Sequence, residues 1–73
     1  MPFSSLTDPV DLARAQAALD AAWAEVADMI HEDGQAEARI WLAHIVASQV
    51  HVALDESDLT ARAVHKFRER WGH

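Results

Sequence analysis

The sequence has 73 residues, of which 51% are hydrophobic and none is cysteine, and its formal net charge is −6. This length suits one domain, spanning residues 1–73, close to the size at which a single hydrophobic core is only just sufficient. The lack of cysteine excludes disulfides, thiolate zinc sites and a cysteine nucleophile. Fifteen of the 37 hydrophobic residues are alanine, so only 22 side chains can bury much area. Oligomerisation is the remaining way to add buried surface.

The sequence predicts neither export nor membrane insertion. Residues 1–5 lack the basic start and apolar run of a secretory signal, which favours a cytoplasmic protein. The longest nearly apolar segment, residues 40–54, contains two histidines and is too short and too polar to span a bilayer. We therefore expect a cytoplasmic protein without membrane contact.

The first helix is expected at about residues 9–32. Thr7 or Asp8 can cap its free amide groups, and Pro9 suits the first turn because its missing N–H is not needed there. Gly34 is expected to close the helix in the left-handed conformation. The apolar residues recur in alternating steps of three and four, which is typical of an amphipathic helix. They are Leu12, Ala15, Leu19, Ala22, Val26 and Met29.

The second helix is expected at about residues 36–54, joined to the first by a short connection that favours an antiparallel pair. Large apolar residues also lie away from its main seam, so the helix is apolar over well over half its circumference and needs neighbours on more than one side. Its main seam consists of Ile40, Ala43, Ala47, Val50 and Leu54.

The third helix is expected at about residues 58–71, after the cluster of acids and cap formers at residues 55–58. Together the three segments predict an all-α three-helix bundle. The apolar face of the third helix consists of Leu59, Ala63, Val64, Phe67 and Trp71.

The surplus of apolar surface on the second helix predicts a homodimer, because two other helices, one of them rich in alanine, cannot cover it. The leading hypothesis is a non-enzymatic protein that acts through homodimerisation or through another protein–protein contact. Large side chains on the flanks of the helices are the interface candidates. They are Trp23, Trp41, Ile45, Val52 and Trp71.

A polar stripe on the second helix contains the strongest metal candidates, His51 and Asp55, whose spacing of four residues would let them share an ion. Two ligands do not make a site, so we predict no metal and no cofactor. His44 and Ser48 have the same spacing, but a nucleophile also needs an orienting acid and an oxyanion site. The sequence therefore predicts no enzyme.

The basic residues of the third helix support the alternative hypothesis, a small regulator that contacts nucleic acid. Residues 1–58 carry a net charge of −9, whereas residues 59–73 carry +3. The overall negative charge and the preference of cations for a helix C-terminus both argue against nucleic-acid binding. The basic patch consists of Arg62, Lys66, Arg68 and Arg70.

Two short patterns carry a resemblance. Ala22-Trp23-x-x-Val26, followed by Arg39-x-x-Leu42-Ala43-x-x-Val46, resembles small uncharacterised bacterial helical proteins of unknown function. The resemblance covers about half of the chain and implies a bacterial, cytoplasmic origin. It implies no activity, so no functional residue is transferred.

Overall fold

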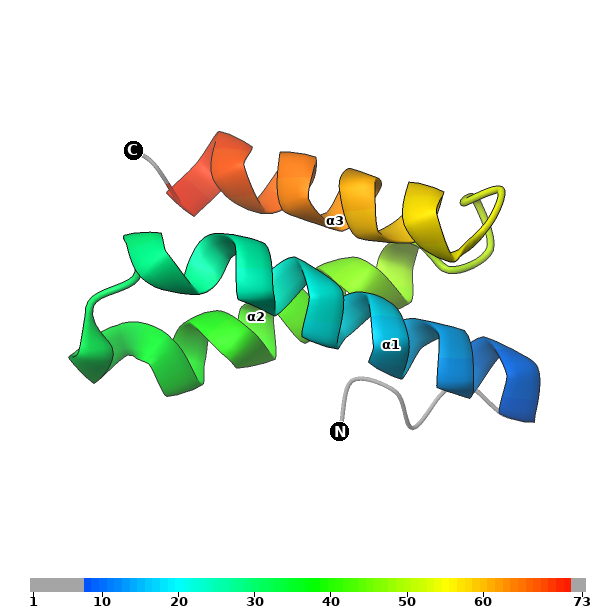
Figure 1. Ribbon diagram of the computed structural model, residues 1–73, viewed down its shortest axis with the longest axis horizontal. Coiled ribbons are helices and arrows are strands. Elements are labelled where there is room, and N and C mark those ends of the chain that lie inside the picture. The colour runs from blue at the N-terminus through cyan, green and yellow to red at the C-terminus, as the bar shows by residue number, and fades with distance from the viewer. Residues whose placement is uncertain (1–7, 72–73) are drawn as a thin grey trace.

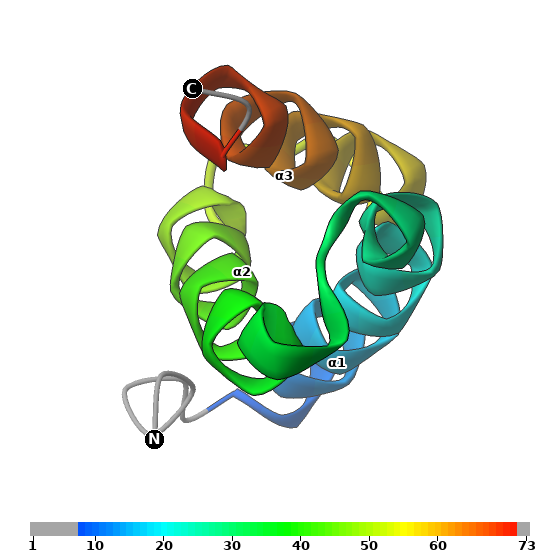
Figure 2. The same cartoon turned by 90° about the vertical axis from the view of Figure 1, so that its left-hand side faces the viewer.

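A computed structural model describes residues 8–71 and shows an all-α three-helix bundle (Figure 1). Its helices are α1 (Pro9–Val26), α2 (Gln35–Gln49) and α3 (Glu56–Trp71), and consecutive helices run in opposite directions. Seen end on, the three helices surround one shared core (Figure 2). The predicted fold class is confirmed. None of the helices in this part of the chain is long and apolar enough to cross a membrane.

The N-terminus of α1 is capped by Asp8. Its carboxylate accepts a hydrogen bond from the backbone N–H of Val10 at 2.8 Å, and Pro9 occupies the first helical position. This arrangement satisfies one of the amide groups that a helix start leaves without a partner. Thr7, the other cap candidate, lies outside the described residues.

The first helix ends earlier than predicted, at Val26 rather than near residue 32. A short 3₁₀ turn, Ala27–Met29, follows it, and Ile30 then adopts an extended conformation. Ile30 is buried, whereas Met29 is 44% exposed. By leaving the helix, the chain places Ile30 in the core instead of Met29, which the pattern had made the last residue of the seam.

The prediction that Gly34 closes the first helix in the left-handed conformation is wrong. Gly34 has φ −102° and ψ 0°, which an L residue can also adopt, and it directly precedes the first residue of α2. A second 3₁₀ turn, Glu32–Gly34, leads into the helix. The chain therefore reverses between α1 and α2 through two short 3₁₀ turns rather than through a glycine cap.

The second helix also ends earlier than predicted, at Gln49 rather than at residue 54, and it faces the core differently. Ile40 is 58% exposed and Leu54 is 85% exposed, although the predicted seam included both. Leu42 and Val46 are fully buried instead. Because α2 carries large apolar side chains around most of its circumference, the apolar pattern alone could not determine which side meets the core.

The third helix buries four of the five residues of the predicted face, leaves Trp71 partly exposed, and begins two residues earlier, at Glu56. The carboxylate of Asp55 accepts a hydrogen bond from the N–H of Asp58 at 2.8 Å. The carboxylate of Asp58 in turn accepts one from the N–H of Leu54 at 2.9 Å. These two bonds resemble a capping box, with the N–H of Leu54 in place of that of Asp55, and they explain both the start of α3 and the tight connection before it.

The core is built largely from small residues. Six of its 15 buried residues are alanines, three of which lie on α1. Helix α1 packs more extensively against α3 than against α2, and alanines allow such close packing of helices but contribute little buried area. The larger side chains that are fully buried are Phe67, Leu42, Leu59, Val26, Val46 and Val50.

The same substitution at a buried and at an exposed leucine tests which side of the second helical segment faces the core. We expect Leu42→Ala to lower the free energy of unfolding by about 2–5 kcal/mol, because it leaves a cavity in the core. Leu54→Ala should change it by no more than about 0.5 kcal/mol, because that side chain is exposed. Urea denaturation followed by circular dichroism measures both, and equal losses would contradict the observed facing.

Candidate interaction surface

Three aromatic rings form a cluster between α2 and α3. The ring centroid of Trp41 lies 5.1 Å from that of Phe67 and 5.6 Å from that of Trp71, and Phe67 stacks on Trp71 at 5.3 Å. Phe67 is fully buried, whereas both tryptophans are partly exposed. These separations suit favourable aromatic pairs. The cluster therefore reaches from the core to the surface.

The surface above this cluster contains two adjoining shallow depressions that share Trp41 and Arg70. We call this surface the Trp41 face. Its most exposed large apolar side chain is Ile40 on α2, beside the two tryptophans. Helix α2 contributes Glu37, Ile40, Trp41, His44, Ile45, Ser48 and Gln49, and α3 contributes Lys66, Glu69, Arg70 and Trp71.

The Trp41 face is electrically neutral, which distinguishes it from the chain as a whole. It carries two acidic residues, Glu37 and Glu69, and two basic ones, Lys66 and Arg70, so the net charge of −6 lies outside it. Glu69 pairs with His65 on its own helix at 2.7 Å. Among residues 8–71, no acidic partner lies within 4.0 Å of Lys66 or Arg70, and no basic one within 4.0 Å of Glu37.

The structure brings together three of the five predicted interface candidates. Trp41, Ile45 and Trp71 all lie on the Trp41 face. Val52 does not, because it follows the last residue of α2 in the connection to α3, at the other end of the bundle from Trp71.

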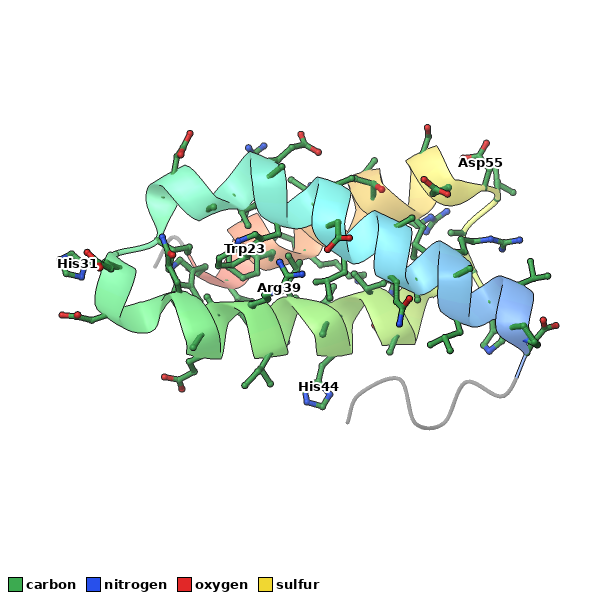
Figure 3. The ribbon with its side chains drawn as sticks, turned by 60° about the horizontal axis from the view of Figure 1, so that its bottom comes forward. Trp23, His31, Arg39, His44 and Asp55 are labelled. Atoms are coloured by element: carbon green, nitrogen blue, oxygen red, sulfur yellow. The ribbon has the colours of Figure 1, made fainter. Side chains whose placement is uncertain are left out.

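The remaining candidate, Trp23, packs between α1 and α2 next to Arg39 (Figure 3). The guanidinium carbon of Arg39 lies 5.7 Å from the centroid of the Trp23 ring, and its Nη2 donates to Oδ1 of Asp20 at 2.8 Å. This cation–π contact and ion pair connect α1 to α2. Trp23 therefore has an intramolecular partner on the surface, whereas Ile40 is 58% exposed.

The four residues of the predicted basic patch do not form one surface. Nε of Arg62 donates to the carboxylate of Asp58 at 2.8 Å, so its charge is already matched. Lys66 and Arg70 lie beside α2 on the Trp41 face. Arg68 lies on the opposite flank of α3, beside Glu25 of α1.

The helical spacing behind the metal candidates His51 and Asp55 does not exist, because α2 ends at Gln49. Asp55 caps α3, and Nδ1 of His51 lies 3.9 Å from the Asp11 carboxylate of α1. His44 points away from the bundle, far from Asp55 (Figure 3). Within residues 8–71, no three His, Asp or Glu side chains come together as a metal site would require.

One pKa shift accompanies the cap of α3. The hydrogen bond from Arg62 lowers the pKa of the Asp58 carboxyl below its ordinary value of 3.8, and the N–H of Leu54 lowers it further. Both donors stabilise the carboxylate, since each hydrogen bond is stronger when its acceptor is charged. Arg62 and Asp58 therefore act together in holding the start of α3.

The sequence reasoning did not identify Ile40 or Glu37 as surface candidates. Ile40 belongs to the core seam predicted for the second helix, and no sequence pattern pointed to Glu37. The signal was the run Ala38, Leu42 and Val46, whose steps of four define a second apolar seam. Choosing that seam would have turned Ile40 outward, next to Glu37.

Comparison with known proteins gives no family for this chain. No protein-family model matches it, and searches of curated proteins and of solved structures returned no match. The function must therefore be argued from the fold and from the Trp41 face.

The cap of α3 predicts an acid dependence of stability. The pKa of Asp58 is lower in the folded chain than its ordinary value of 3.8. The carboxylate therefore adds to the free energy of unfolding above pH 3.8, and this stabilisation is lost as the pH falls through the pKa of the folded chain. Asp58→Asn should therefore cost the most stability near neutral pH and less at pH 2–3. Urea denaturation across this pH range measures the difference, with Asp28→Asn, in the 3₁₀ turn after α1, as the control. A difference independent of pH would contradict this role of Asp58.

Proposed function

We propose that this chain is a non-enzymatic interaction protein that acts by binding a second copy of itself through the Trp41 face. The observation that carries the proposal is Ile40, 58% exposed beside two partly exposed tryptophans on a neutral surface of an acidic chain. Tryptophan and large aliphatic side chains at the centre of a contact, with charges at its edge, are typical of protein–protein interfaces.

The distribution of charge favours a second copy over other partners. Two chains of charge −6 repel one another over most of their surfaces, and the repulsion is weakest where both present neutral faces. A strongly acidic or strongly basic partner would gain little from a face with two acids and two bases. A second copy presents the same neutral apolar surface.

The size of the chain also favours self-association. A standard interface buries about 800 Å² on each partner, which is about one sixth of the 4713 Å² that this chain exposes. Burial of that extent would supplement a core in which six of the 15 buried residues are alanines. The dimer would therefore be more stable than the monomer, and its stability would depend on concentration.

The alternative function, contact with nucleic acid through α3, receives less support. Phosphate binding needs several free cations on one surface. Arg62 is paired with Asp58, and Arg68 lies on the other flank of α3 from Lys66 and Arg70. The remaining two cations share their surface with Glu37 and Glu69.

The same substitution at two similarly exposed residues, one on the Trp41 face and one outside it, tests the proposed function. Ile40→Glu should weaken self-association by at least about tenfold, because it places a charge within the apolar contact. Val52→Glu, at a position that is 55% exposed but outside the Trp41 face, should leave it unchanged. Sedimentation equilibrium at chain concentrations from roughly 1 to 500 μM measures the dimer dissociation constants of both variants. A wild-type chain that stays monomeric throughout would overturn the proposal.

A further inference from the structure

We infer that the two copies meet through identical Trp41 faces related by a two-fold axis, with Glu37 of each subunit paired with Arg70 of the partner subunit. This inference rests on the proposed function and adds to it the geometry of the contact and the residues that determine it. It follows from an acid and a base that border the same depression as the exposed apolar side chains.

Glu37 and Arg70 border the same depression, together with Ile40, Trp41 and Trp71. Glu37 comes from the first turn of α2, and Arg70 comes from the last turn of α3. Both side chains are exposed, and neither has an oppositely charged partner within 4.0 Å among residues 8–71. The face therefore presents one acid and one base that no ion pair within residues 8–71 occupies.

A two-fold contact would contain two such pairs of acid and base, one on each side of the symmetry axis. In such a contact, any residue that touches a second residue of the partner is touched in return by that second residue. One Glu37–Arg70 pair across the interface therefore implies a second, and the apolar side chains that border the same depression are covered with them. Both subunits then match their charges and cover Ile40 in one step.

A head-to-tail contact is less favourable on the same grounds. Three other large apolar residues among residues 8–71 are more than half exposed. They are Val10, at the start of α1, and Val52 and Leu54, in the connection after α2. The same parts of the chain carry Asp8, Asp11, Asp55 and Glu56. An acidic surface of this kind would match Arg70 but would repel Glu37 on the Trp41 face.

Charge reversal tests the pairing. Glu37→Arg turns both pairs into two arginines, and Arg70→Glu turns both into two glutamates, so each variant alone should self-associate at least about tenfold more weakly than the wild type. An equimolar mixture of the two variants should form a heterodimer with nearly wild-type affinity. In that heterodimer, each contact again joins one arginine to one glutamate.

Mixing separates this pairing from an effect within one chain, because a contact inside a subunit cannot be repaired by adding another subunit. The double variant Glu37→Arg/Arg70→Glu should also regain self-association. The matched control is Glu25→Arg and Arg68→Glu, an acid and a base that border a groove between α1 and α3. These two variants should self-associate like the wild type, alone and mixed.

The measurement is sedimentation equilibrium of fluorescently labelled variants at pH 8, since histidine side chains change charge at lower pH. Circular dichroism confirms that each variant is folded. Glu37→Gln and Arg70→Gln provide a milder pair that should each weaken association alone and regain part of it on mixing, because the heterodimer contains one intact Glu37–Arg70 contact. A wild-type dimer that both reversals leave unchanged, or that mixing fails to restore, overturns the two-fold pairing but leaves self-association standing. A monomeric wild type overturns both.

Discussion

The Trp41 face depends on the burial of Phe67. This ring is the largest side chain that is fully buried, and it lies within 5.3 Å, centroid to centroid, of both Trp41 and Trp71. By filling the space between α2 and α3, Phe67 holds two large rings at the surface that would otherwise be free to reorient. The hydrophobic core and the proposed contact surface are thus parts of one cluster, and a change in either affects the other.

The narrow core explains why so small a chain leaves Ile40 exposed. Three helices with many alanines provide a narrow core, and α2 has more large apolar side chains than two neighbours can cover. The core takes Leu42 and Val46, so Ile40, on the opposite side of α2, remains outside. Exposed apolar surface beside half-buried tryptophans is what distinguishes this face from the polar surfaces around it.

The sequence predicted the helices and the buried faces of α1 and α3 well, because each of these helices has one apolar stripe and a capping signal such as Asp8. It could not predict the facing of α2, where two seams compete, nor the 3₁₀ turns that replace a glycine cap at Gly34. The Trp41 face was only partly predictable. Glu37 and Arg70 are far apart in the sequence, and only the packing of α3 against α2 brings them to one depression.

The arrangement of the tryptophans has a spectroscopic consequence. The chain contains three tryptophans and no tyrosine. Its fluorescence excited at roughly 295 nm, beyond the absorption of phenylalanine, and its circular dichroism at such wavelengths therefore arise from indole rings alone. Trp41 and Trp71 are close enough for their transitions to couple, whereas Trp23 stands apart beneath Arg39. The coupled signal would report on the α2–α3 surface, and Trp23 would provide an internal reference from the α1–α2 contact.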